Sequence, residues 1–168
     1  MKFQKWSVFQ AQAIALAAGL FLLPVSASAQ QQAGGAFSQF AGDWSGEGTV
    51  KTTAGRERIR CKVHYDVASG GASLEQKMRC ASDSYKLEVR SKVAATGTRL
   101  TGKWNEITRD SIGNISGTIT SAGIKAMIDG IGFTAGMDIL TEANRQSITI
   151  DPSGATEIAH VEITLTRI

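Results

Sequence analysis

The feature that most constrains this chain is an alternation of apolar and polar residues with a period of two. It begins at Trp44 and continues with few interruptions to Leu165. Successive side chains of a β-strand point to opposite faces of a sheet, so this period is typical of strands with one buried face. No segment of helical length has the period of an amphipathic helix, although residues 31–40 can hold one short helical turn. The chain is therefore expected to be all-β.

Every second residue marks the apolar face of an expected strand, and short turns rich in Gly, Ser, Asn or Asp separate the strands. One such turn is expected at Asp151-Pro152-Ser153-Gly154. The expected inward stripes are Trp44-Gly46-Gly48-Val50, Ile59-Cys61-Val63-Tyr65-Val67, Leu74-Gln76-Met78-Cys80, Tyr85-Leu87-Val89-Ser91-Val93, Leu100-Gly102-Trp104, Ile115-Gly117-Ile119, Ile124-Ala126-Ile128, Phe133-Ala135-Met137-Ile139, Ile148-Ile150 and Ala159-Val161-Ile163-Leu165. The pattern predicts about ten antiparallel strands.

Each of these strands must bury its apolar face against another element. Closing the sheet on itself buries every face and also removes the exposed edges. We therefore predict an antiparallel up-and-down β-barrel of about 8–10 strands, with a β-sandwich as the second architecture. An outer-membrane barrel has an apolar outward face, whereas one face here carries Arg58, Arg60 and Lys62. No insertion into a membrane is expected.

The first 29 residues have the three parts of a secretory signal peptide. Lys2 and Lys5 form a positive region, residues 13–23 form an apolar run, and Ala27-Ser28-Ala29 is a small-residue cleavage site. The apolar run is shorter than the roughly 20 residues of a membrane-spanning helix. We predict cleavage after Ala29, a short N-terminal segment over residues 30–41 and a barrel domain over residues 42–168. The predicted location is the periplasm or the cell exterior.

Cys61 and Cys80 lie on adjacent expected strands that are joined by the turn Ser69-Gly70-Gly71-Ala72. If Gly70 and Gly71 are central in that turn, the two cysteines face each other directly. An oxidising compartment then favours a structural disulfide. A two-residue turn would make them a hydrogen-bonded pair, in which the α-carbons lie farther apart, and a four-residue turn would change this.

Positive charge is concentrated in one part of the chain. Residues 56–92 contain nine basic and five acidic side chains, whereas residues 110–168 contain three basic and seven acidic ones. The outer face of one hairpin is expected to carry Arg58, Arg60, Lys62, Lys77 and Arg79. Such a patch suits an anionic component of the cell envelope, although an ordinary solvated face has the same composition. Nucleic acid is not expected, because Tyr65 and Tyr85 are predicted to point inward rather than offer stacking surfaces.

The motif Gly42-Asp43-Trp44-Ser45-Gly46-Glu47-Gly48 lies at the entry to the first expected strand, and Gly102-Lys103-Trp104 follows later. In a barrel, the glycine allows a tight turn and the tryptophan plugs one end. The motif resembles that of the calycins, the group that includes lipocalins, avidins, fatty-acid-binding proteins and nitrobindins. The chain is also similar to small secreted alphaproteobacterial proteins of unknown function, a resemblance that implies no activity.

The segment containing His160, Val161, Leu165 and Arg167 is similar to the C-terminal strand of nitrobindins. In that family a histidine of this strand ligates haem, so the resemblance implies His160 as a haem ligand in one alternative. The alternation instead places His160 on the polar face with Glu162 and Thr164.

No enzyme signature is recognised: the chain has no G-x-S-x-G elbow, and two histidines without free cysteines do not form a metal cluster. We expect a non-enzymatic barrel, without cofactor or metal, that binds a small, mostly apolar ligand. Its expected lining is Trp44, Tyr65, Met78, Tyr85, Trp104, Glu106 and Phe133. Glu106 would either orient the ligand or reach solvent. The alternatives are a barrel without a cavity that acts through its surface, as an envelope-interaction module or an inhibitor of a secreted enzyme, and the haem-binding protein.

Overall fold

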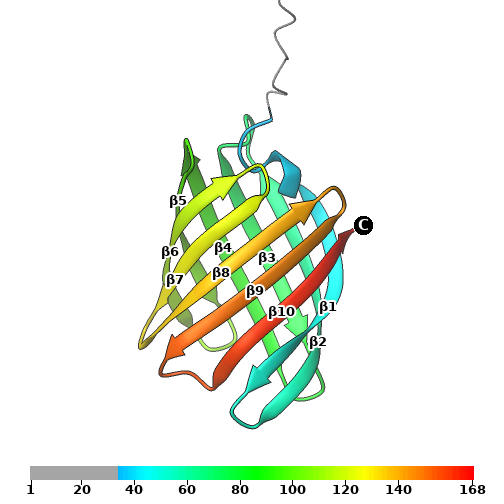
Figure 1. Cartoon of the computed structure of the whole chain (residues 1–168), viewed down its shortest axis with the longest axis vertical. Helices are drawn as coiled ribbons and strands as arrows, with labels where there is room; N and C mark the ends of the chain where they lie inside the picture. The colour runs from blue at the N-terminus through cyan, green and yellow to red at the C-terminus, as the bar shows by residue number, and fades with distance from the viewer. Residues whose placement is uncertain (1–33) are drawn as a thin grey trace, which may run out of the picture. The chain divides into compact units, whose positions relative to one another are not determined.

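The computed structural model describes residues 34–168 (Figure 1). This part of the chain contains a short 3-10 helix, η1 (Ser38–Phe40), and ten strands. The strands are β1 (Gly42–Thr52), β2 (Gly55–Val67), β3 (Ser73–Ala81), β4 (Lys86–Thr96), β5 (Arg99–Glu106), β6 (Ser111–Thr120), β7 (Gly123–Gly130), β8 (Phe133–Glu142), β9 (Arg145–Gly154) and β10 (Ile158–Arg167). The predicted signal peptide, residues 1–29, lies outside the described residues.

The strands form one closed antiparallel barrel in which each strand pairs with its neighbours in the sequence. β10 returns to pair with β1 and so closes the sheet. The predicted up-and-down barrel is therefore confirmed, and the sandwich is not formed. Among residues 34–168 there is no helix with the length and hydropathy needed to cross a bilayer.

Two glycines allow the barrel to close at the seam between β1 and β10. A Cβ atom on Gly46 would overlap the Thr164 carbonyl oxygen, and one on Gly48 would overlap that of Glu162. Only residues without a side chain allow β1 to approach β10 so closely. The small inward residues of β1 therefore serve closure of the sheet at this seam.

The predicted alternation holds along most of the barrel, with two local departures near its last turn. Lys51 pairs with His160 whereas Thr52 pairs with Ile158, so Ala159 is an extra residue in a β-bulge. The bulge leaves Ala159 exposed, not inward as predicted, and packs Ile158 against the core.

Residues 151–154 belong to β9 rather than to the predicted turn. The pairing of β9 with β10 ends at Ile150, so Pro152 lies where its missing amide hydrogen leaves no β10 partner unpaired. The turn is displaced to the residues between Gly154 and Ile158.

Candidate functional site

An aromatic cluster closes one end of the barrel. Phe37 donates its main-chain N–H to the Gly71 carbonyl, which holds the segment before η1 against the β2–β3 turn. The rings of Phe40 and Tyr65 meet edge to face with their centres 5.8 Å apart. Those of Trp44 and Tyr65 meet in the same way with their centres 6.5 Å apart. Phe37, Phe40 and Trp44 are all fully buried. Burial of these rings excludes water from this end of the interior.

Arg167 of β10 fixes Trp44 within this plug. Its guanidinium lies 4.3 Å from the centre of the Trp44 ring system. Its Nη2 donates to the Gln39 carbonyl at 2.6 Å, and its Nη1 donates to the Ala41 carbonyl. Trp44 in turn donates its indole Nε1–H to the Phe40 carbonyl at 2.8 Å. The planar fork of arginine suits this double contact with the main chain. This role of Arg167 was not predicted from the sequence.

The phenol of Tyr65 belongs to a buried polar group beneath the plug. Its hydroxyl donates to Gln146 Oε1 at 2.9 Å. Burial raises the pKa of Tyr65 well above its usual range, so the hydroxyl stays protonated. Gln146 faces Thr141 across β8 and β9, and neither Gln146 Nε2 nor Thr141 Oγ1 has a hydrogen-bond partner among the described residues.

The inward-facing side chains are less completely buried away from the plug. Near η1, Leu100, Ile119 and Leu165 are at most 2% exposed. On the wall formed by β4–β9, most inward-facing apolar residues toward the opposite end are half-buried, whereas Ile115 and Ala135 are buried. We call this surface the apolar wall; its members are Leu87, Val89, Trp104, Ala126, Ile128, Phe133, Met137, Ile150 and Pro152. Since these side chains face inward in a closed sheet, solvent reaches the interior on this side.

Trp104 and Phe133 form the aromatic part of the apolar wall. Their ring centres lie 5.9 Å apart. Trp104 donates its Nε1–H to the Asp129 carbonyl at 3.0 Å, which holds the indole against β7. The satisfied N–H leaves the indole face to make apolar contacts.

Glu106 does not extend into the interior. Its Oε1 accepts the main-chain N–H of Thr108 at 2.9 Å and its Oε2 accepts that of Arg109 at 2.8 Å. A further N–H comes from Glu88 at 3.3 Å. Burial opposes ionisation, but these hydrogen bonds outweigh it, and the pKa of Glu106 lies below its usual range. The carboxylate therefore stabilises the β5–β6 turn.

The seven residues predicted to line one ligand site thus lie in different parts of the barrel. Trp44 and Tyr65 are in the plug, and Met78 is buried in β3. Trp104 and Phe133 belong to the apolar wall. Glu106 and Tyr85 lie at or beside turns of the opposite end. The Arg109 guanidinium there lies 4.5 Å from the centre of the Tyr85 ring.

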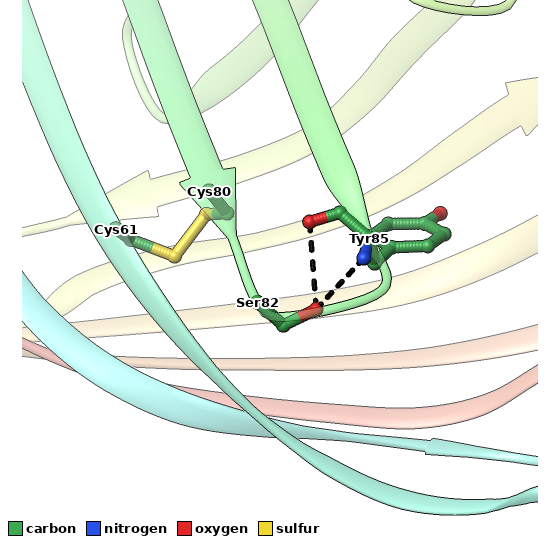
Figure 2. The surroundings of a disulfide bond; sticks show 4 residues. All are labelled: Cys61, Cys80, Ser82 and Tyr85. Carbon is green, nitrogen blue, oxygen red and sulfur yellow. Dashed lines mark hydrogen bonds between the residues drawn. A yellow bond between two sulfur atoms is a disulfide. The ribbon is translucent and has the colours of Figure 1, made fainter.

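The predicted disulfide between Cys61 and Cys80 is confirmed, with the predicted register (Figure 2). Ala68 donates its N–H to the Ser73 carbonyl, so the turn has four residues. From the Ala68–Ser73 pair, hydrogen-bonded and non-hydrogen-bonded pairs alternate along β2 and β3. The cysteines therefore form a non-hydrogen-bonded pair, with α-carbons 4.1 Å apart. Figure 2 also shows the next turn, where the Tyr85 N–H donates to Ser82 Oγ at 3.0 Å.

The outer face of β1–β4 is hollowed in two places that share Lys62, Arg79 and Glu88. Their volumes are about 400 and about 790 Å³. We call the two together the basic trough. The cations that line it are Arg60, Lys62, Lys77, Arg79, Lys86 and Arg90, and the carboxylates are Asp43, Glu47 and Glu88. Of the predicted basic patch, Arg58 lies outside the trough and pairs with Glu47 at 2.9 Å.

The contribution of β4 to this surface was not predicted from the sequence. Lys86, Glu88 and Arg90 alternate along one face of β4, and that spacing would have placed them beside the predicted patch. Glu88 accepts from Arg79 at 3.0 Å and from Arg90 at 3.3 Å, and these contacts hold its pKa below the usual range. Within the part of the chain that the structure describes, no ion pair involves Arg60, Lys62, Lys77 or Lys86.

Both histidines lie on the outer surface. His64 contacts Asp43 at 2.7 Å. His160 lies between Asp151 at 2.5 Å and Glu162 at 3.2 Å, and these hydrogen bonds raise its pKa above the usual range. Neither imidazole faces the interior, so a haem group there would find no histidine ligand among residues 34–168. The same residues contain no cluster of His, Cys, Asp and Glu that could hold a metal ion.

No protein-family model matches this chain, and no curated protein matches it. Among solved structures, the crystal structure of Rv2717c from M. tuberculosis is similar, with a TM-score of 0.62 and 12% sequence identity. The match covers 79% of this chain and 95% of that one. At this identity the likeness extends to the fold alone, which is a closed β-barrel.

Proposed function

We propose that this protein is an exported, calycin-type barrel that binds a small, mostly apolar molecule against the apolar wall and catalyses no reaction. The observation that carries the proposal is the exposure of inward-facing apolar side chains to solvent. Ala126, Met137 and Ile150 lie in the middle of their strands and are nevertheless only half-buried. Covering such a surface releases about 25 cal/mol for each Å² of apolar area removed from water.

The chemistry of the interior supports an uncharged ligand. The single carboxylate buried among residues 34–168, that of Glu106, is occupied by its own turn. An ionised ligand would therefore lose its hydration on entering the barrel and would find no opposite charge there. Trp104 and Phe133 offer aromatic faces, so an aromatic or branched hydrocarbon group fits the wall better than a polar one.

The plug and the disulfide support the other parts of the proposal. Trp44, the tryptophan of the calycin-like motif, lies in the closed end of the barrel. Since the plug closes that end, a ligand would enter from the opposite end. A disulfide is typical of compartments outside the cytoplasm.

The test is titration of the purified protein with N-phenyl-1-naphthylamine, an uncharged probe whose fluorescence rises in an apolar environment. The unmodified protein is expected to bind it, and Ala126→Trp, which fills the interior with an indole, is expected to abolish binding. Met127→Trp is the matched control, because Met127 is adjacent but points outward and is 48% exposed. Circular dichroism and thermal melting establish that both variants are folded.

The proposal is contradicted if the unmodified protein does not bind the probe, or if the two tryptophan variants lose it equally. Native mass spectrometry of protein purified from its own host gives a second readout, since a retained apolar molecule should be displaced by the probe.

A further inference from the structure

We propose that the basic trough binds a strand of an acidic polysaccharide. This site lies on the outside of β1–β4 and is independent of the proposed interior site, so either can fail without the other. Six cations line the trough against three carboxylates. Such an excess attracts an anionic ligand and accelerates its association at low ionic strength.

The register places like charges directly opposite each other in the trough. Lys62 of β2 pairs with Arg79 of β3, and Lys77 of β3 pairs with Arg90 of β4. Facing cations on neighbouring strands repel and destabilise the sheet locally. Glu88 contacts Arg79 and Arg90 but neither lysine. An anionic group bound between Lys62 and Arg79 would remove this repulsion. Relief of the repulsion would therefore contribute favourably to the free energy of binding.

The shape of the trough favours a linear chain. Its cations lie on three successive rows of the sheet, from Lys77 and Arg90 through Lys62 and Arg79 to Arg60 and Lys86. Rows two residues apart are about 7 Å from each other along a strand. The rows can therefore meet anionic groups that recur along an extended polymer, which a single small anion does not require.

The carboxylates in the trough indicate a sugar rather than a bare polyphosphate. Asp43, Glu47 and Glu88 would repel a ligand that carries only anionic oxygens. They would accept hydrogen bonds from the hydroxyl groups of a sugar, while Ser45 and Thr108 add neutral polar groups to the lining. A polymer with both carboxylates and hydroxyls matches both kinds of side chain.

Two other classes of anionic partner, a lipid surface and a nucleic acid, fit the trough less well. A lipid surface would be expected to engage several exposed apolar side chains, but of the large ones exposed among residues 34–168 the trough is lined by Ile168 alone. The others, Ile107, Ile112, Met127, Ile131 and Leu140, lie on β5–β8 or their turns, outside the trough. Single-stranded nucleic acid uses exposed aromatic rings for stacking. Trp44 is the one Phe, Trp or Tyr residue in the lining, and it is fully buried.

The test is binding of fluorescently labelled polygalacturonate fragments to the full chain, measured by anisotropy across a range of salt concentrations. The double variant Lys62→Gln/Arg79→Gln is expected to weaken binding about tenfold and to reduce its salt dependence, because two charge contacts are lost. The control is Arg99→Gln/Lys103→Gln on β5, which likewise removes one arginine and one lysine charge, but outside the trough. It is expected to stay within about twofold of the unmodified protein.

Absence of polygalacturonate binding, or equal losses in the two double variants, would overturn the proposal. Vesicles rich in phosphatidylglycerol and a DNA oligonucleotide are tested in parallel. If either binds more tightly than polygalacturonate and depends on Lys62 and Arg79, the trough serves that class and the polysaccharide assignment is wrong. Thermal melting shows that the variants remain folded, and N-phenyl-1-naphthylamine binding, unchanged in both, shows that the interior is intact.

Discussion

Replacing Cys61 and Cys80 by alanine removes the link between β2 and β3 while leaving their pairing possible. The two cysteines are separated by 19 positions along the chain. In the chain-entropy description, cross-linking a loop of that length stabilises the folded state by about 3 kcal/mol, because it restricts the unfolded chain. Both cysteines are almost fully buried, so the loss of two sulfur atoms from the core adds to the effect.

The expected loss of unfolding free energy is therefore about 3–4 kcal/mol. Urea unfolding followed by tryptophan fluorescence measures it, and the midpoint should fall by about 1–2 M at the usual dependence on urea for a small domain. The matched comparison is the unmodified protein unfolded with a phosphine reductant present. It should approach the double variant after the disulfide is reduced, whereas the folded protein should resist reduction because the sulfurs are buried.

A loss below about 1 kcal/mol would refute this reasoning, since the turn and the core alone would then restrict the hairpin as strongly as the disulfide does. Salt provides a further check. In the oxidised unfolded chain Lys62 and Arg79 stay near each other, because they are adjacent to the linked cysteines in the register. Without the link they separate on unfolding, so added salt should stabilise the double variant more than the unmodified protein.

Three further changes test the plug, the β5–β6 turn and the seam. Arg167→Met should lower the unfolding free energy by about 2 kcal/mol and Arg167→Lys by less, since methionine loses the cation over Trp44 and both main-chain contacts; urea unfolding measures both. Glu106→Gln should cost about 1–3 kcal/mol at neutral pH, because an amide cannot accept all three N–H groups. As the folded pKa of Glu106 is lowered, its contribution is present above the pKa of the unfolded carboxyl and is lost as pH falls through the folded value; unfolding measured from pH 7 to pH 3 should therefore show a shallower acid decline in the variant. Gly46→Ala should destabilise by about 1–3 kcal/mol, since its Cβ would overlap the Thr164 carbonyl; an unchanged melting temperature would contradict the role of this residue at the seam.

The fold could be predicted because its determinants are local in the sequence. Alternation reports which side of a strand is buried, and short turns make consecutive strands neighbours in the sheet. The register of Cys61 and Cys80 followed from one turn for the same reason. The bulge at Ala159 was missed because an extra residue reverses the alternation only locally, with no marker such as glycine or proline at that position.

The candidate sites were harder to predict, because they depend on which strands meet across the barrel and how completely each is covered. Alternation places Trp44 and Trp104 on the same inward face, although one is fully buried and the other only half-buried. That difference arises from the segment before η1, which covers only one end. Glu106 was expected to face inward, but the hydrogen bonds that turn its carboxylate toward Thr108 and Arg109 depend on the conformation of a turn that no sequence pattern specified.

The two proposed sites make different demands on the same sheet. The apolar wall lies on β4–β9, where the inward side chains away from the plug are mostly half-buried, whereas the basic trough lies outside β1–β4, where the inward side chains Cys61, Met78 and Cys80 are buried. A surface that holds facing cations needs a rigid support, because repulsion between Lys62 and Arg79 favours separation of β2 and β3. The disulfide lies one residue away in the register and covalently prevents that separation. We therefore interpret the disulfide as the element that allows this hairpin to carry its charge, and the opposite wall, which has no such link, as the part of the barrel free to adapt to a ligand.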